Sequence, residues 1–267
     1  MCYKLICTDI DGTLLNKDRE LSEFTIKEVQ RIAHIPFVLI SSRMPKAIRH
    51  LQHQFNNTNT PIIAYNGGLV LDNDTILHST VIDNTILDVI INECANTNIH
   101  LSLYYADEWY VPSMDYWAKR ESRNTKIIPT IKSNKAVLAK WEREKKGAHK
   151  IMCMGNENEI EVLYKLLKMR FYDEIALYRS KPAYIEISHK SISKKTAIEV
   201  LLKKCFPKIY MKNIVAFGDN YNDIEMLKAV GLGVAVANAN DEVLTVADKI
   251  TDSNINDGVA KSIKELF

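Results

Sequence analysis

Short apolar segments that end in small or polar residues recur along this chain, and they constrain its fold more than any other feature. Each has the length of a buried strand, and segments with helical periodicity separate most of them. Five such strands are expected, at residues 3–10, 36–40, 61–65, 214–217 and 234–237. Strands that alternate with helices predict a doubly wound α/β fold with a parallel sheet. The functional site of such a sheet lies at the carboxyl ends of its strands.

The segment from about residue 82 to about residue 189 differs from the rest of the chain. Helical runs alternate there with short strands, and aromatic residues are concentrated in it. After Lys194 the earlier alternation of strand and helix returns. We therefore expect a core domain built from residues 1–82 and 190–267, with an α+β domain at residues 83–189 inserted into it. The elements expected in the insertion are helices at 86–94, 137–141 and 160–167 and strands at 99–105, 150–154 and 183–187.

Composition argues against several classes of partner. The chain has 267 residues, 46% of them hydrophobic, so it can bury a large core. Its formal net charge of +2 and its lack of a long basic block argue against nucleic acid. The first strand begins too close to Met1 to leave room for a signal peptide, and no apolar run is long enough to span a bilayer.

The cysteines point to a reducing compartment. They are scattered, odd in number and never spaced as C-x-x-C, which is typical of buried thiols and not of a disulfide framework. We therefore expect a cytoplasmic protein without a membrane partner, present as a monomer or a weak homo-oligomer. The cysteines are Cys2, Cys7, Cys94, Cys153 and Cys205.

The first expected strand ends in the motif Asp9-Ile10-Asp11-Gly12-Thr13. In an extended strand Asp9 and Asp11 would point to the same side. Two crowded carboxylates are unfavourable unless a proton or a cation separates them. A divalent metal would resolve the repulsion and would leave one carboxylate for nucleophilic or acid chemistry. The alternative is a pair of capping aspartates at a junction between a strand and a turn.

A second acidic motif, GDNYND, occupies residues 218–223, just after the strand expected at 214–217. Helix capping by Asn222 or Asp223 would explain one acidic residue there, but not both Asp219 and Asp223. Because both acidic motifs follow strands of one sheet, together they can supply the oxygen ligands that Mg²⁺ prefers.

With these motifs the chain resembles the haloacid dehalogenase-like superfamily of phosphotransferases, and most closely its Cof-type branch, which carries a large inserted cap. Four motifs occur in the family's order and approximate spacing: DxDGT, a hydroxyl residue after the second strand, a lysine before a helix, and GDxxND. The resemblance covers essentially the whole chain. It implies an α/β core that carries the chemistry and an α+β cap that sets substrate specificity.

The resemblance also implies catalytic and metal-binding roles. Asp9 would attack phosphorus as the nucleophile, and Asp11 would act first as general acid and then as general base. Mg²⁺ would be held by Asp9, Asp219 and the backbone carbonyl of Asp11. Asp223 would orient this set of ligands or bind the metal directly.

Substrate-binding roles follow from the same resemblance, although each residue also has an ordinary explanation. Ser41 would bind a phosphoryl oxygen, but it could instead cap the helix expected to begin near Pro45. Lys194 would neutralise the nucleophile and the transferring group, but it could belong to a solvated run of lysines. Asn66 and Gly67 would lie beside the substrate, but they are also a common turn dipeptide. The substrate-binding residues implied are Ser41, Ser42, Arg43, Asn66, Gly67, Arg179, Lys194 and Asn222.

Two of these positions leave specific questions. Relatives often carry Thr-Gly-Arg where this chain has Ser41-Ser42-Arg43, and Ser41 keeps the hydroxyl while Ser42 adds bulk. Arg179 could reach the substrate's hydroxyl groups, or it could pair with a surface carboxylate such as Glu174.

The expected activity is hydrolysis of a small phosphorylated metabolite, preferably a sugar phosphate. The enzyme would be a Mg²⁺-dependent phosphatase that works through an aspartyl-phosphate intermediate. One alternative is a phosphomutase or phosphotransferase that uses the same nucleophile. Another is a regulator that binds a phosphorylated metabolite without catalysis, although such a protein would not need to keep both Asp9 and Asp11.

Overall fold

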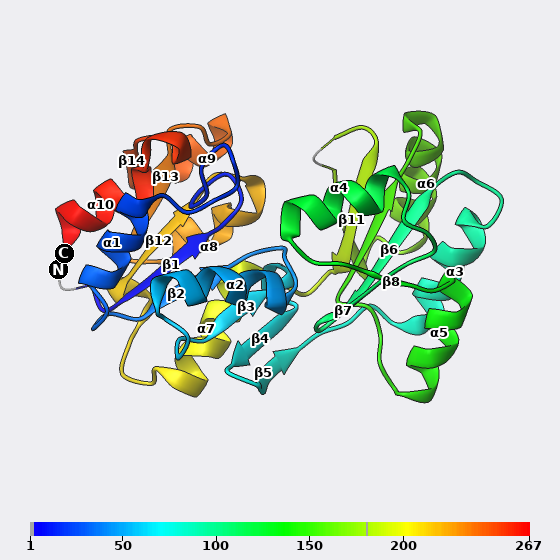
Figure 1. Ribbon diagram of the computed structural model, residues 1–267, viewed down its shortest axis with the longest axis horizontal. Coiled ribbons are helices and arrows are strands. Elements are labelled where there is room, and N and C mark those ends of the chain that lie inside the picture. The colour runs from blue at the N-terminus through cyan, green and yellow to red at the C-terminus, as the bar shows by residue number, and fades with distance from the viewer. Residues whose placement is uncertain (1–2, 180) are drawn as a thin grey trace. The chain divides into compact units, whose positions relative to one another are not determined.

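The computed structural model describes residues 3–179 and 181–267 and divides into two compact units (Figure 1). The core unit ends its first segment at His78 and resumes at Ser193, and the insertion unit is Ser79–Ile192. The domain boundaries expected from the sequence, 82/83 and 189/190, lie a few residues from these junctions. Among the described residues, none of the helices combines the length and apolar character needed to cross a bilayer.

The core unit is built on an eight-stranded sheet in the order β14-β13-β12-β1-β2-β3-β4-β5. Neighbouring strands from β14 to β3 run parallel, and β4 pairs antiparallel with β3. The predicted α/β fold is therefore confirmed, and the central strands are the buried apolar segments from which it was predicted. The strands are β1 (Leu5–Asp9), β2 (Phe37–Ile40), β3 (Ile62–Ala64), β4 (Leu69–Asp72), β5 (Thr75–Ser79), β12 (Ile214–Gly218), β13 (Leu232–Val236) and β14 (Lys249–Thr251).

The helices of the core unit pack in two groups, with α1 against α2 and α10, and with α8 against α7 and α9. The side chain of Ser22 caps α1 by accepting a hydrogen bond from the N–H of Thr25. Helix α2 begins at Pro45, which stands in its first turn, as expected from the sequence. These helices are α1 (Glu23–Arg31), α2 (Pro45–Phe55), α7 (Lys194–Cys205), α8 (Ile224–Ala229), α9 (Asp241–Val246) and α10 (Gly258–Leu266), with short 3₁₀ turns at η1 (Tyr65–Gly67), η2 (Met211–Asn213), η3 (Tyr221–Asp223) and η4 (Asn254–Asn256).

The insertion unit has its own sheet, in the order β10-β11-β9-β6-β7-β8, and its own apolar core. Alternate residues of the central strands, such as Leu101, Ile151 and Ile185, pack with apolar residues of α3, α5 and α6. The insertion unit therefore has a hydrophobic core formed by its own sheet and helices. Its elements are α3 (Asn84–Cys94), β6 (His100–Tyr105), β7 (Glu108–Val111), α4 (Tyr116–Thr125), β8 (Thr130–Ile131), α5 (Asn134–Arg143), β9 (Lys150–Met154), α6 (Glu157–Arg170), β10 (Ile175–Tyr178) and β11 (Tyr184–His189).

A buried histidine ties the start of the insertion unit to its sheet. Nδ1 of His149 accepts a hydrogen bond from the backbone N–H of Ala106, at 3.1 Å, so the ring proton must sit on Nε2. Nε2 lies 3.0 Å from Oγ of Ser79 and donates to it. Burial lowers the pKa of His149 from 6.5 to about 4, because the charged imidazolium would be desolvated.

This histidine should make the protein less stable in acid. The folded-state pKa lies below the unfolded one, so the unfolded state binds more protons between pH 6.5 and pH 4, and stability falls as the pH falls through that window. We expect about 3 kcal/mol of unfolding free energy to be lost between pH 7 and pH 4 through this residue. Urea unfolding of the wild type and of His149→Gln at both pH values measures it. Equal pH dependence in the two proteins would contradict the assignment.

Candidate active site

The two acidic motifs meet at the carboxyl ends of β1 and β12. These strands are parallel neighbours, with Thr8 opposite Phe217, so Asp9 and Asp219 leave the sheet at adjacent points. Asp9, Asp219 and Asp223 each place a carboxylate oxygen within 4.8 Å of the others. The sheet thus gathers acids that are far apart in the sequence.

Two glycines make this close approach possible. Gly12 has φ +90°, and a Cβ at this position would lie 2.5 Å from Oδ2 of Asp219. At Gly218 a Cβ would meet Cβ and Cγ of Asp223, also at 2.5 Å. A side chain at either position would therefore push an acidic residue out of the cluster.

Lys194 lies inside the acidic cluster. It is the first residue of α7, and its Nζ donates to Oδ1 of Asp9 and to Oδ1 of Asp223, each at 2.6 Å. Its side chain has no solvent exposure, whereas that of Lys195 is 43% exposed. Lys194 is therefore not part of a solvated run of lysines. Although burial alone would lower the pKa of Lys194, the two carboxylates outweigh it and raise that pKa above its usual value.

The three carboxylates of the cluster together carry more negative charge than the single ammonium group of Lys194 compensates. Burial, followed by repulsion from Asp223 and Asp219, raises the pKa of Asp9 well above its usual value, although Lys194 opposes the shift. Burial also raises the pKa of Asp219 to about 6, although Oγ1 of Thr13 donates to its Oδ1 at 2.7 Å. A further cation beside these oxygens would relieve the repulsion.

Both carboxylate oxygens of Asp223 accept hydrogen bonds from protein donors. Its Oδ1 accepts from Lys194, and its Oδ2 accepts from the backbone N–H groups of Asp219 and Asn220, at 3.0 Å each. The residue is completely buried. Asp223 therefore fixes both the lysine and the loop that carries Asp219.

Asp11 lies beyond the end of strand β1, so the side-chain alternation on which the extended-strand argument relied does not extend to it. Strand β1 ends at Asp9, and the chain then turns through Asp11 and Gly12. The Asp11 carboxylate accepts from Nε and Nη2 of Arg43, at 2.7 Å each, and from Nη1 of Arg19 at 3.2 Å. The guanidinium of Arg43 thus holds both oxygens of Asp11.

The remaining residues implied by the core motifs surround the same strand ends. Oγ of Ser41 accepts from the backbone N–H of Arg43 at 3.1 Å, and it does not cap α2, which begins after Met44. The carbonyl oxygen of Ser41 accepts from the N–H of Asn66 at 2.9 Å. Nδ2 of Asn222 donates to Oδ1 of Asn66 at 3.1 Å. The loops after β2, β3 and β12 are therefore joined by hydrogen bonds.

Three further positions complete the comparison with the predicted residues. Gly67 has φ +111°, and a Cβ there would lie 2.5 Å from the carbonyl oxygen of Ser193, so glycine allows η1 to pack against the start of α7. Oδ1 of Asn222 is buried and has no hydrogen-bond partner among the described residues. Ser42 is half-buried next to Ser41.

Arg179 belongs to the insertion unit and has partners there. Its guanidinium contacts Glu161, donates to the carbonyl oxygen of Pro182 at 2.7 Å, and lies over the ring of Tyr164 at 5.0 Å. The carboxylate that it contacts is thus Glu161, and not the Glu174 suggested from the sequence. A role of Arg179 in substrate binding stays a prediction.

Sequence reasoning gave no role to Thr13 or Arg19. Thr13 could have been found, because it belongs to the DxDGT motif and its hydroxyl binds Asp219. Arg19 carried no signal, since its contact with Asp11 depends on the shape of an irregular loop.

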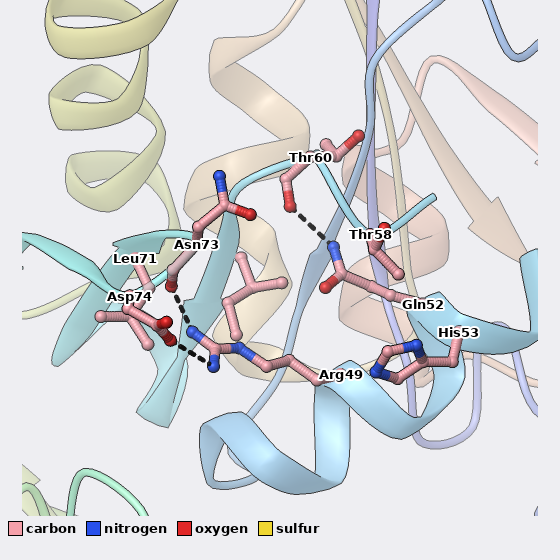
Figure 2. A pocket seen from close by; sticks show the side chains of 9 residues that line it. Arg49, Gln52, His53, Thr58, Thr60, Leu71, Asn73 and Asp74 are labelled. Carbon is pink, nitrogen blue, oxygen red and sulfur yellow. Dashed lines mark hydrogen bonds and ion pairs between the residues drawn. The ribbon is translucent and has the colours of Figure 1, made fainter. Parts of the chain in front are cut away.

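A separate cavity of about 220 Å³ lies between α2 and the β3–β5 region of the core unit (Figure 2). None of the predicted site residues lines it. Its wall includes Arg49, whose guanidinium donates to Oδ1 of Asp74 at 3.0 Å.

A family model described as haloacid dehalogenase-like hydrolase matches residues 6–263. The chain belongs to this family. A Bacillus subtilis protein named 5-amino-6-(5-phospho-D-ribitylamino)uracil phosphatase is 30% identical over 269 residues, which cover 98% of this chain and 94% of that protein. A Haemophilus influenzae protein named "Putative phosphatase" is 31% identical over 272 residues, which cover 100% of this chain and 99% of that protein.

Solved structures agree with this assignment. The crystal structure of a haloacid dehalogenase-like hydrolase from Bacteroides thetaiotaomicron is 28% identical and superposes with a TM-score of 0.89, covering 99% of this chain and all of that one. This haloacid dehalogenase-like hydrolase is therefore an enzyme of the phosphatase type, as its family and its phosphatase-named relatives indicate.

Proposed function

We propose that this hydrolase is a Mg²⁺-dependent phosphatase that acts on a small phosphorylated metabolite, preferably a sugar or polyol phosphate, through an aspartyl-phosphate at Asp9. One observation carries the proposal: Asp9 is a buried carboxylate with one oxygen bound by Lys194, beside Asp219, while Arg43 holds the carboxylate of Asp11. Asp9 and Asp11 thus have different protein partners, which suits one to be the nucleophile and the other to be the acid and base.

The chemistry of the cluster fits Mg²⁺. Its donors are hard carboxylate oxygens, and their repulsion is only partly offset by Lys194. Asp9, Asp219 and the backbone carbonyl of Asp11 would hold the metal, while Asp223, whose oxygens already have protein donors, would orient the loop. When bound, Mg²⁺ supplies positive charge that stabilises the transferring phosphoryl group.

The first half-reaction forms the aspartyl-phosphate. An oxygen of Asp9 bonds to phosphorus as the bond between phosphorus and the ester oxygen breaks. The carboxylic acid form of Asp11 gives its proton to that ester oxygen, so the alcohol leaves neutral. Lys194 fixes the orientation of Asp9 and offsets the negative charge of the phosphoryl group.

The second half-reaction restores the enzyme. The Asp11 carboxylate takes a proton from a water molecule, whose oxygen bonds to phosphorus as the bond to Asp9 breaks. Inorganic phosphate leaves, and both Asp9 and the acid form of Asp11 are regenerated. One residue thus serves first as acid and then as base, and the guanidinium of Arg43 positions its carboxylate.

The substrate class rests on similarity. The name of the Bacillus subtilis relative describes a phosphate ester on a ribityl chain, which is a phosphorylated polyol. This supports a small polyhydroxylated substrate. Phosphate release from a panel of sugar, polyol and nucleoside phosphates, with and without Mg²⁺, tests the proposal. Isomer formation without free phosphate would show a phosphomutase, and binding without turnover would show a regulator.

The acid role of Asp11 should depend on the leaving group. In Asp11→Asn, the first half-reaction should slow much less for an aryl phosphate than for an alkyl phosphate, because an aryl oxide of low pKa leaves without protonation. Single-turnover rates for para-nitrophenyl and benzyl phosphate measure the difference. Equal losses with the two esters would remove Asp11 from the acid role.

Replacement of Mg²⁺ by Ca²⁺ should inhibit the enzyme. Ca²⁺ takes more ligands at longer distances, so it can draw both oxygens of Asp9 into coordination and misdirect the attacking one. Phosphate release at matched concentrations of the two ions is the measurement. Full activity with Ca²⁺ alone would argue against a carboxylate shared by nucleophile and metal site.

A further inference from the structure

Helix α6 of the insertion unit carries apolar side chains on two faces. One face packs in the apolar core of the unit. The other face carries Val162, Leu166 and Met169, whose spacing of four and then three residues places them on one side of the helix. Val162 is 68% exposed and Met169 is 79% exposed, while Leu166 is half-buried. These three residues form an exposed apolar stripe, the α6 stripe. The residues of the buried face are Ile160, Leu163 and Leu167.

An apolar cavity of about 270 Å³ lies beside the α6 stripe. Val162, Leu166 and Ile99 line it, and Glu159 is part of its wall. Oε1 of Glu159 accepts from the backbone N–H of Asn98 at 3.3 Å, whereas Oε2 is buried and has no hydrogen-bond partner among the described residues. A buried carboxylate oxygen without a donor is unfavourable. A further donor brought to this end of the stripe would therefore be favoured.

The two ends of α6 carry opposite charges. Glu157 and Glu159 lie in its first turn, and Lys168 and Arg170 lie in its last turn. Glu159 and Arg170 are eleven residues apart, so they lie on the same side of the helix. Their backbones are about 16 Å apart along the helix axis, too far for the two side chains to pair within one chain. Charges in this order also suit the dipole of α6, but the dipole does not account for the apolar stripe between them.

We propose that the α6 stripe is the interface of a weak homodimer, in which α6 packs antiparallel against α6 of a second copy of this chain. A two-fold axis through the middle of the stripe sets Val162 opposite the partner's Met169 and Leu166 against the partner's Leu166. In an antiparallel pair, the first turn of each helix lies beside the last turn of the other. The same axis therefore brings Glu159 to the partner's Arg170, which supplies the missing donor.

A second copy suits this surface better than other occupants of an apolar stripe. The acidic first turn would repel an anionic membrane, and a peptide with charges of one sign would meet like charge at one end. An antiparallel copy of α6 meets opposite charge at both ends. Lys165, near the middle of the helix, would approach the partner's Lys165, but Glu161 of the same chain pairs with it at 3.3 Å.

Sedimentation velocity of the full chain over a wide range of concentration tests the dimer. We expect a dissociation constant of about 10–100 µM, because one helix face lies at the low end of interface sizes. Met169→Glu places a charge on the stripe and should weaken the dimer about tenfold or more, while the exposure of Met169 in the single chain protects the fold. Ile128→Glu is the matched control. Ile128 is 83% exposed and belongs to the same unit but not to α6, so this variant should dissociate like the wild type.

Charge reversal tests the pairing of the helix ends. Glu159→Arg and Arg170→Glu should each weaken the dimer about tenfold, because each brings like charges together. An equimolar mixture of these two variants should form a heterodimer about as stable as the wild-type dimer, since both contacts then join opposite charges. Misfolding of either variant could not produce this rescue.

Three results would overturn the inference. The first is a wild type that stays monomeric at every concentration. The second is a dimer that Met169→Glu and the charge reversals leave unchanged, and the third is a mixture of the charge-reversed variants that does not associate. None of these measurements uses a substrate, so their outcome is independent of the proposed function.

Discussion

The variant Asp9→Asn should lose phosphate release by roughly 10⁴-fold or more and keep its fold, because an amide cannot attack phosphorus. Asparagine has nearly the same shape and can still accept a hydrogen bond from Nζ of Lys194, which lies 2.6 Å from Oδ1 in the wild type. Burial and the neighbouring acids already raise the pKa of Asp9, so removing its charge should not destabilise the cluster. Phosphate release and urea unfolding measure the two effects.

An exposed aspartate provides the control for Asp9→Asn. The Asp74 side chain is 96% exposed, and Asp74→Asn should leave both activity and stability unchanged. Activity of Asp9→Asn within tenfold of the wild type would refute the nucleophile assignment. A large loss of unfolding free energy would instead show that the charge of Asp9 holds the site together.

Replacement of Lys194 by methionine should destabilise the protein by about 3–5 kcal/mol and abolish turnover, because it leaves Asp9 and Asp223 buried without their cation. Methionine fills much of the lysine volume, so the effect reports on charge more than on packing. Lys194 opposes the upward shift of the Asp9 pKa, so without it the folded-state pKa of Asp9 would lie further above the unfolded one. A raised pKa of an acid favours the folded state at low pH, and this contribution is lost as the pH rises. The loss of unfolding free energy in Lys194→Met should therefore grow between pH 5 and pH 8.

Lys195→Met is the control that separates the loss of a buried lysine from the loss of a lysine in general. Lys195 follows Lys194 in α7, but its side chain is 43% exposed and pairs with Glu199 at 3.8 Å. The substitution should change the unfolding free energy by less than about 0.5 kcal/mol. If Lys194→Met unfolded at the same urea concentration as Lys195→Met, the buried ion pairs would not hold the site together.

The sequence was informative where local pattern and sheet geometry decide the outcome. β1 and β12 are buried and mainly apolar, and parallel pairing brings their carboxyl ends together, so the approach of Asp9 to Asp219 could be predicted. The edge strands were harder to predict. Strand β5 is half-exposed and carries no apolar run, and β14 has three residues that reach the surface, so neither produced a signal.

Side-chain partners were largely beyond prediction. The pairing of Asp11 with Arg43 and Arg19 depends on the turn that follows β1, and the left-handed backbone of Arg19 has no signature in its residue type. Asp223 was expected to orient the metal ligands or to bind the metal. Its carboxylate accepts hydrogen bonds from the N–H groups of Asp219 and Asn220, contacts that spacing alone does not reveal, and its role toward a metal stays a prediction.

The discontinuity of the core unit has a consequence for the order in which the protein is made. Asp9 and Lys194 are 185 residues apart, and every strand of the insertion unit is synthesised between them. On the ribosome, the edge of β1 that pairs with β12 stays unpaired until β12 is synthesised. All elements of the insertion unit are complete before that point. The contacts of the site are among the most distant in sequence, so we expect them to form late in folding. A nascent chain that stops before α7 would carry the nucleophile without the lysine that holds it.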